Sequence, residues 1–432
     1  MKSDNQYFKC NKMKQIYLIV GMVFWASLGF AQPLSVEQYR AKVLEYNQDI
    51  QKSQQAVDGA LFSLKSVKTG FFPKVDASGN YSYQLEDVEF FPGTNLKHDN
   101  YGVEAGLVQN VYAGSAVRKQ YDIAKLQHAI SQLAADHTVD NIIYAADVAY
   151  WAVAANKKLY RLSVDYVELI KELYDVVNTR FKEDAISKID LLQVQTRLKE
   201  ADLQLNTTST NYMIALQSLN IMMGVEPNAG SVLIDSVDKP LWVPLQMELN
   251  QVLENRSDYQ ATIKNLEVAK TQTSLVRSQF MPQLAVGLKE KYGTTMINID
   301  GKERWTTTAY AQLSIPVFHW GKKRKDVGIS RTQEEARELE RSQMQDQVSK
   351  ELSGAWVNVT ETSKKLHIIY STLDIVQENL ELNTFSYNEG RLPILDVLSA
   401  QVSWLQAYTN VVAVNYQYKV ALAEYVKVLG GN

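Results

Sequence analysis

The sequence predicts a mainly α-helical protein with a smaller β component, in which a long helical hairpin and a pair of amphipathic strands each occur twice. The stretch from Ser115 to Asp184 contains neither Gly nor Pro, and its apolar residues recur at spacings of three and four. Such spacing is typical of a helix with one buried face. A similar stretch follows later in the chain, and two segments of alternating polar and apolar residues precede each stretch. At ~1.5 Å per residue, a helix of this length reaches on the order of 100 Å, which implies a coiled-coil or tubular structure rather than one globular core.

A tandem duplication relates the two halves of the chain. Asp190 matches Asp396 at an offset of 206 (396 − 190 = 206), and Pro73 matches Pro282 at an offset of 209 (282 − 73 = 209). The change of offset falls between Pro73 and Tyr112, so the chain tolerates a change of length there. We divide the chain into a first structural repeat at 32–224, a connector at 225–247 and a second structural repeat at 248–432.

Residues 1–31 are typical of a secretory signal peptide. Lys12 and Lys14 precede an apolar run from Ile16 to Phe30, and a small-residue cleavage site ends at Ala31. A retained membrane anchor is the alternative, but it would need ~20 apolar residues. Met13 is a second possible start of the chain.

Composition argues against several classes of function. Cys10 is the only cysteine and lies ahead of the apolar run, so the mature chain is expected to hold no disulfide and no thiol nucleophile. A net charge of −3 gives no bias toward nucleic acid. The histidines show no metal-ligand spacing, and no nucleophile elbow, phosphate-binding loop or carboxylate pair stands out. We therefore expect no enzyme, no cofactor, no bound metal and no membrane helix after the signal.

The first repeat is predicted to begin with a helix that Ser35 caps and that runs to about Thr69, with Gln38 completing a capping box. Strict alternation then predicts a strand over Val75–Glu86, and Pro92-Gly93 marks a turn in the loop that follows. The remaining elements are a strand at 101–112, the long helix at 115–184, a turn at 183–188 and a returning helix at 189–223. One apolar stripe of the long helix consists of Tyr144, Val148, Trp151, Ala155, Leu159, Leu162, Tyr166, Leu169, Leu173 and Val176.

The second repeat is predicted to hold the same elements in the same order. Pro227, Pro240 and Pro244 make the connector irregular. The elements after it are a helix at 249–279, a strand near 284–292, a turn at 298–301, a strand near 309–315, a long helix at 322–387, a turn at 389–393 and a helix at 394–429.

The strands point to a membrane. Each is about as long as a tilted strand needs to be to cross a bilayer, and each has one apolar face. Four strands cannot close a wide barrel, and open edges in lipid would leave backbone groups unpaired. Three copies would give twelve strands, with apolar faces toward lipid and polar faces toward water. A soluble sandwich with one solvated face is the alternative.

Taken together, the chain resembles the TolC-like outer-membrane efflux family over about 34–429. The most specific segments are the two turns, Arg180-Phe-Lys-Glu-Asp-Ala-Ile-Ser-Lys-Ile-Asp190 and Asn388-Glu-Gly-Arg-Leu-Pro-Ile-Leu-Asp396, followed by Val317-Phe-His-Trp-Gly-Lys-Lys-Arg324. The resemblance implies a homotrimer in which a twelve-stranded barrel in outer-membrane lipid continues into a periplasmic barrel of helices. It places 225–247 in an equatorial region and implies two partners, a periplasmic adaptor protein and an inner-membrane transporter.

The resemblance also implies roles for particular residues. The adaptor would dock on the helical tips, at Asp184, Ala185, Ile186, Ser187, Gly390, Arg391, Leu392 and Pro393. Asp190 and Tyr387 would face each other in a closed gate, and Asp396 would lie just inside the same entrance. Simple capping of the returning helices is the alternative for both aspartates, because a carboxylate is favoured in the first turn of a helix. The chain departs from the family by having Asp184 rather than Gly in the first turn, and Ser399 where some members carry a second acidic residue.

The expected function is a passive exit duct for small molecules, driven by an energised partner. Export of an unfolded polypeptide is a second possibility within the family, and a periplasmic coiled-coil adaptor or scaffold is a possibility from another class. An adaptor would not need four amphipathic strands of bilayer length. The cations from Lys322 to Lys325 could contact lipid phosphates or could form a solvated first turn.

Overall fold

The computed structural model describes residues 33–238, 243–295 and 297–431, so the predicted signal peptide and Cys10 lie outside the described residues. The helices are α2 (Val36–Tyr46), α3 (Gln48–Lys68), α4 (Ala116–Lys182), α5 (Lys188–Met222), α6 (Leu249–Asn255), α7 (Ser257–Ser278), α8 (Lys322–Asn388) and α9 (Ile394–Val428), with a 3-10 turn η1 (Thr69–Phe71) after α3. The strands are β1 (Lys74–Tyr83), β2 (Glu89–Phe91), β3 (Thr94–Asn95), β4 (Asp99–Ala113), β5 (Gln283–Gly293) and β6 (Arg304–Ser314).

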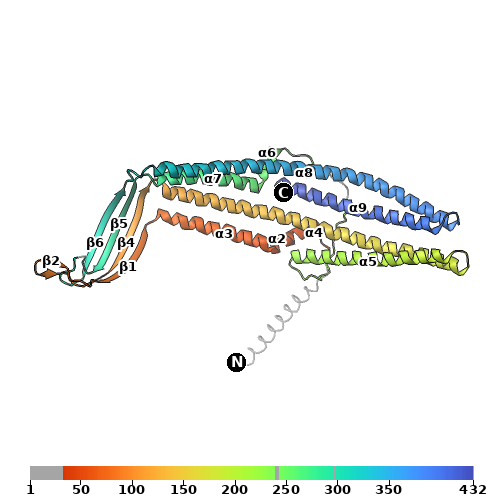
Figure 1. Ribbon diagram of the computed structural model, residues 1–432, viewed down its shortest axis with the longest axis horizontal. Coiled ribbons are helices and arrows are strands. Elements are labelled where there is room, and N and C mark those ends of the chain that lie inside the picture. The colour runs from red at the N-terminus through yellow and green to blue at the C-terminus, as the bar shows by residue number, and fades with distance from the viewer. Residues whose placement is uncertain (1–32, 239–242, 296, 432) are drawn as a thin grey trace, which may run out of the picture.

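The molecule is a long, narrow bundle of helices with a sheet at one end (Figure 1). The two longest helices, α4 and α8, each contain 67 residues, and the helices that return from their far ends, α5 and α9, each contain 35. The other half of each long helix is covered by the helix that leads to the strands, α3 on α4 and α7 on α8. The predicted mainly helical fold with a smaller sheet is confirmed.

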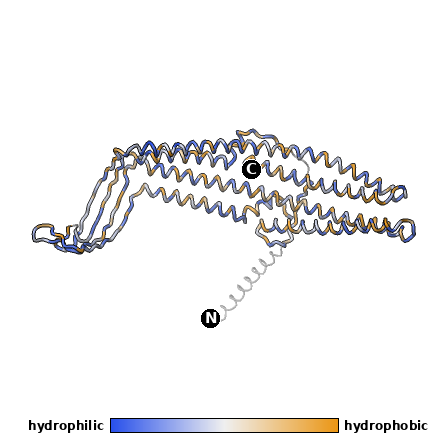
Figure 2. Tube along the Cα trace, in the orientation of Figure 1, coloured by the Kyte–Doolittle hydropathy of each residue, from blue (hydrophilic) through white to orange (hydrophobic). Residues whose placement is uncertain are grey.

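Hydrophobic and hydrophilic residues alternate along every helix, as Figure 2 shows. In the described part of the chain, no helix has both the length and the apolar character that crossing a membrane requires.

Each of the two predicted strand-leading helices is broken once, which corrects the sequence prediction. The first has the predicted capping box, in which the Ser35 hydroxyl accepts from the Gln38 N–H. It then ends at Tyr46, and a new helix begins because the Asn47 side chain accepts hydrogen bonds from the N–H groups of Asp49 and Ile50, at 2.9 and 3.2 Å. Such local side-chain bonds compete with the helical ladder.

The break in the second repeat lies at the matching position, Arg256 (256 − 47 = 209). Arg256 adopts an extended conformation, and its guanidinium donates to Asp258 and to Glu351 on α8. Burial alone would lower the pKa of Arg256, but these two carboxylates outweigh it and raise that pKa. The matching junctions are therefore held by different side chains, an asparagine cap in one and a buried ion pair in the other.

The sheet has the strand order β1-β4-β5-β6, and all neighbours are antiparallel. Val75 lies opposite Leu107 in the first hairpin, and Leu284 lies opposite Leu313 in the second. These positions are related by the two sequence offsets, 209 for the first strands (284 − 75 = 209) and 206 for the second (313 − 107 = 206). The difference of length between the repeats therefore lies in the loops between the strands of each hairpin. The loop of the first hairpin also contains a small ribbon of β2 and β3, which the sequence did not predict, and it turns at Gly93 (φ +84°) as expected.

The sheet has one apolar and one polar face, as the alternation predicted. Val75, Leu107, Leu288 and Ala309 form one row across four strands of the apolar face. On the polar face, the Glu104 carboxylate accepts from the Lys289 ammonium at 2.9 Å. Both faces are largely exposed in the single chain, since no helix among the described residues covers either one. The sheet thus presents a largely apolar surface, which Glu290 and Thr307 interrupt, and its two edges, β1 and β6, have no partner strand among the described residues.

The buried core runs along the helices in separate clusters. The largest cluster lies near the middle of the bundle, around Tyr39, Tyr150 and Val153, and smaller clusters follow toward the far end. The predicted stripe of α4 is largely buried, but it ends on Val177 rather than on Val176, which is 41% exposed. A helix with 3.6 residues per turn drifts relative to a seven-residue spacing, so the buried position moves by one residue over several turns.

Candidate functional site

The two turns between long and returning helices lie at the end of the bundle far from the sheet (Figure 1). We call residues 183–187 the first tip and residues 389–393 the second tip. In each, the backbone N–H of the third residue after the helix donates back into the last turn: Ala185 to the Arg180 carbonyl and Arg391 to the Ser386 carbonyl, both at 2.9 Å. This closing hydrogen bond needs a left-handed residue between helix and turn, a common helix ending.

Asp184 and Gly390 are these left-handed residues, with φ of +56° and +71°. Gly adopts this conformation without strain, whereas Asp has a penalty that its short polar side chain reduces. A Cβ built on Gly390 would meet no atom within 4 Å, so the backbone conformation alone, and no contact within the chain, favours glycine there. The departure at Asp184 therefore leaves the shape of the first tip close to that of the second.

The two tips differ in how the returning helix begins. The Ser187 hydroxyl accepts from the Asp190 N–H at 3.2 Å, and the Asp190 carboxylate accepts from the Ser187 N–H and hydroxyl at 3.2 and 2.9 Å. In the second tip, Pro393 takes the capping position and offers no side-chain hydrogen bond. The carboxylate of Asp190 is thus already in use as a helix cap, and the exposed Asp396 is not.

Most predicted tip residues are exposed, namely Asp184, Ala185, Ser187, Gly390, Arg391 and Pro393, while Ile186 and Leu392 are half-buried. Ile186 packs against a hydrophobic cluster that joins the two hairpins just below the tips. The buried members of this cluster are Leu173, Val177, Leu191, Val194, Tyr387, Ile394, Val397 and Leu398. Because both repeats contribute to it, the cluster fixes the two tips side by side.

Tyr387 belongs to this cluster and is only 5% exposed. Its hydroxyl has no hydrogen-bond partner among the described residues. Burial raises the pKa of the Tyr387 phenol, the adjacent Arg180 guanidinium opposes this rise, and the charge of Asp190 adds the smallest contribution, an increase. The two residues predicted to form a gate are therefore close enough to interact electrically, yet no hydrogen bond joins them in the single chain. A buried hydroxyl without a partner costs about 1–3 kcal/mol, so this site is poised for an acceptor.

Arg180 connects the two tips, a role that the sequence did not predict. Its guanidinium lies 4.8 Å from the centre of the Tyr387 ring and donates to the carbonyls of Tyr387 and Asn388 at 3.3 and 3.0 Å. These carbonyls end α8, where a cation is favoured by the helix dipole. The matching residue of the second repeat is Ser386. The presence of a cation in only one of the two repeats is the feature of the sequence from which a special role for Arg180 could have been predicted.

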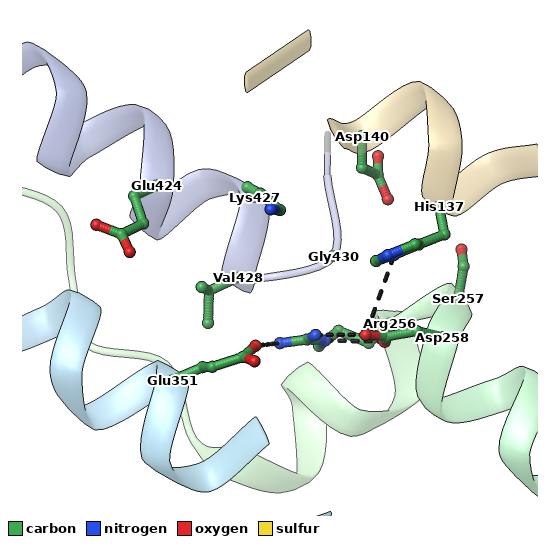
Figure 3. A pocket seen from close by; sticks show the side chains of 10 residues that line it. All are labelled: His137, Asp140, Arg256, Ser257, Asp258, Glu351, Glu424, Lys427, Val428 and Gly430. Carbon is green, nitrogen blue, oxygen red and sulfur yellow. Dashed lines mark hydrogen bonds and ion pairs between the residues drawn. The ribbon is translucent and has the colours of Figure 1, made fainter. Parts of the chain in front are cut away.

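A second polar site lies near the middle of the bundle, in a cavity of about 320 Å³ (Figure 3). Arg256 lies at its floor between Glu351 and Asp258, and the His137 ring is 4.0 Å from Asp258. Burial raises the pKa of Asp258, but the hydrogen bond and charge of Arg256 lower it more, so this carboxylate stays ionised. The charges satisfy one another, which is typical of a structural junction. Across the described residues, no cluster of three or more histidine, cysteine or acidic side chains could hold a metal ion.

Comparisons with known proteins agree with this architecture. A family model described as "Outer membrane efflux protein" matches residues 40–225 and 249–431, which leaves out the connector. Nodulation protein T of Rhizobium leguminosarum bv. trifolii is 18% identical over 394 residues, which cover 89% of this chain and 82% of that protein.

Two solved structures show the same fold. The CmeC outer membrane channel of Campylobacter jejuni has a TM-score of 0.77 and 17% identity, covering 92% of this chain and 85% of that chain. The outer membrane protein VceC of Vibrio cholerae has a TM-score of 0.78 and 13% identity, covering 92% of this chain and 96% of that chain.

The left-handed backbone of both tips predicts that replacing glycine by a residue with a side chain destabilises a tip, and that the reverse replacement at the matching position does not. Gly390→Ala should destabilise the second tip by about 1–2 kcal/mol, because a Cβ is strained in the left-handed region. Asp184→Gly should leave the first tip unchanged or slow its opening, because it removes that strain. Hydrogen exchange of the Ala185 and Arg391 amides would measure both effects. Faster exchange at the mutated tip in both variants would contradict this account.

Proposed function

This chain belongs to the outer membrane efflux protein family, and on that premise we propose that it is a passive exit duct through which an energised partner expels small molecules. The observation that carries the proposal is a sheet with one apolar face and two open edges, continuous with helices that reach on the order of 100 Å. The apolar face of the sheet is compatible with a lipid environment, and the polar exposed faces of the helices are compatible with an aqueous compartment next to the membrane. The duct would contribute a water-filled path and a gate, and no chemistry.

The open edges support a homotrimer. Unpaired backbone groups cost several kcal/mol each in lipid, so β1 and β6 need partners from other copies of the chain. Three copies of four strands give a closed barrel of twelve, with rows such as Val75 and Leu107 toward outer-membrane lipid. The same symmetry would gather the helices into a periplasmic tube whose six tips point away from the membrane.

The tips are the proposed docking surface for a periplasmic adaptor protein, which would connect the duct to an inner-membrane transporter. Their exposure and their fixed backbone shape support this role, since a preformed surface loses little entropy on binding. Leu392 and Ile186 add a modest apolar element to a surface that is otherwise polar.

Tyr387, Asp190 and Asp396 are the proposed gate residues. The buried Tyr387 hydroxyl lacks an acceptor, and a carboxylate from a neighbouring tip could supply one in the assembled tube. A phenol-to-carboxylate hydrogen bond contributes about 1.5–3 kcal/mol, so three copies could hold a closed state that adaptor binding opens. The exposed Asp396 carboxylates would form a ring of like charge at the entrance that favours cations.

The barrel predicts that a charge on the apolar face is far more harmful than one on the polar face. Tyr83→Lys or Ala105→Lys should weaken assembly by up to ~2–4 kcal/mol, depending on depth in the bilayer. Ser82→Lys is the matched control on the polar face. Glu104→Lys is a poorer control, because it also breaks the ion pair with Lys289. Heat-resistant trimer bands from outer-membrane fractions provide the measurement, and equal loss on both faces would refute the barrel.

The docking proposal predicts that Gly390→Trp abolishes efflux while trimers persist. A Cβ at position 390 meets no atom of its own chain within 4 Å and the position is exposed, so the added bulk would act on the partner. Gly390→Asn is the matched control, because Asn tolerates the left-handed conformation and should keep efflux. Gly390→Cys should also cross-link to a periplasmic protein in cells. A stable Gly390→Trp trimer with normal efflux would remove the tips as a docking surface.

The gate proposal predicts that Tyr387→Phe and Asp190→Asn each raise single-channel conductance in planar bilayers, and that the double variant adds little. Asp190→Asn also weakens a helix cap, so Ser187→Ala is the control, since it disrupts the cap and keeps the carboxylate. Asp396→Asn should mainly reduce cation selectivity. If Ser187→Ala conducts like Asp190→Asn, the aspartate acts as a cap and not as a gate.

A further inference from the structure

We propose that Trp320, at the corner between β6 and α8, acts as a wedge against the corner between α3 and β1 of the next copy, so that this corner is wider than its counterpart inside the chain. This inference rests on the proposed trimer and adds a place where the contact between copies cannot match the contact inside the chain. The occupant of both surfaces is a second copy of the chain.

The duplication provides the template for this interface. Inside one chain, the second strand of the first repeat pairs with the first strand of the second repeat, β4 with β5, and the following helix α4 packs against α7. The second strand of the second repeat, β6, has no such neighbour within the chain. The first strand of the first repeat, β1, is the other free edge. Repeating the template between copies therefore places β6 beside β1 of the next copy and α8 beside its α3.

Pairs of identical residues at matching positions of the two repeats differ in exposure, and the difference shows where a neighbouring strand is missing. Leu313 on β6 is 62% exposed, whereas its counterpart Leu107 on β4 is 39% exposed. Tyr83 on β1 is 55% exposed, and its counterpart Tyr292 on β5 is 43% exposed. The side chains are the same and their positions in the strand are equivalent. Leu107 and Tyr292 are less exposed because the neighbouring strand in the β4–β5 seam covers them. Leu313 and Tyr83 lack such a neighbour in the single chain, so the corresponding surface stays exposed.

The template also fixes the register between copies. Ala105 lies opposite Glu290 in the β4–β5 seam. Adding 206 to the first number (105 + 206 = 311) and subtracting 209 from the second (290 − 209 = 81) places Ala311 opposite Tyr81 of the next copy. The template extends farther than β6 does in the single chain, since β4 runs to Ala113 while β6 stops at Ser314. Residues 315–319 would therefore become strand only when the next copy supplies the pairing edge.

One position breaks the symmetry. Gly114 and Trp320 are counterparts (320 − 114 = 206), and both have left-handed backbones, with φ of +58° and +49°. A Cβ on Gly114 would lie 2.6 Å from the Ser278 carbonyl oxygen and 2.6 Å from the Met281 Cβ, so only glycine fits that corner. Trp320 has a Cβ and a large indole that is 91% exposed.

The corner between copies must therefore be wider than the corner inside the chain. The counterparts of Ser278 and Met281 are Thr69 and Phe72 (278 − 209 = 69; 281 − 209 = 72). Phe72 is 61% exposed in the single chain. The wedge fills this wider gap with an aromatic contact, so the barrel mouth at the helical side would alternate between three close corners and three open ones.

Disulfide trapping in outer-membrane fractions tests the register, in a chain with Cys10→Ser. Ala311→Cys with Tyr81→Cys should give covalent dimers and trimers. Ala105→Cys with Glu290→Cys is the template control and should give an intrachain disulfide that leaves a monomer band. Ala309→Cys with Tyr81→Cys tests a two-residue slip and should cross-link at least tenfold less. Stable trimers that cross-link only in the slipped pair overturn the register and leave the proposed function standing, whereas absence of trimers in the parent chain removes both.

The wedge is tested by comparing two corners. His319→Cys with Lys74→Cys joins the corner between copies, and its template is Ala113→Cys with Gln283→Cys inside the chain. The pair between copies should cross-link several-fold less than its template, and Trp320→Gly should bring the two yields together. Equal yields with Trp320 present would contradict the wedge. A photo-cross-linking amino acid at position 320 should label residues 69–72 of the next copy, and labelling of lipid alone would overturn the contact.

Discussion

Backbone hydrogen bonding at the free edges of the sheet is the constraint on which the other features depend. Four strands with one apolar face cannot remain unpaired in lipid, and no segment of the described chain folds back over either edge. The helices do not relieve this, since they continue away from the sheet in one direction (Figure 1). In a chain built in this way, each free edge of the sheet lacks the strand that would complete its hydrogen bonds. Its exposed apolar rows and open edges would be liabilities in a monomer, which is why they support the proposed assembly.

The duplication keeps the backbone and changes the side chains where the two repeats have different neighbours. The strand registers, the lengths of the long and returning helices and the left-handed residues of the tips agree between the repeats. The residues that hold these features differ, with an asparagine cap opposite a buried arginine at the helix breaks and an aspartate opposite a glycine at the tips. In the proposed assembly, both repeats would build the same tube, which accounts for the shared backbone geometry. The side chains could differ because each repeat meets the other inside the chain on one side and would meet another copy on its outer side.

Just below the rigid tips lies a buried hydroxyl, that of Tyr387, without a hydrogen-bond partner among the described residues. Arg180 and the apolar cluster hold the two hairpins together from below, and the capping box holds the start of α5. Against this firm background, the buried Tyr387 hydroxyl is the group that another arrangement of the tips could satisfy. A closed and an open state would then differ by a few hydrogen bonds, a difference that a docking protein can supply.

The sequence by itself determined the duplication, the long helices, the alternating strands and the turn positions, because period and offset can be counted from residue types. Only the tertiary structure decided the features that depend on contacts between side chains and distant parts of the chain. The helix breaks at Asn47 and Arg256 depend on side-chain bonds that compete with the helical ladder, and the shift from Val176 to Val177 depends on the drift of a real helix. Arg180 gained a role because its partners are carbonyls on another helix, more than two hundred residues away in the chain. Likewise, the contrast between Gly114 and Trp320 has meaning only once the structure shows which backbone approaches the glycine.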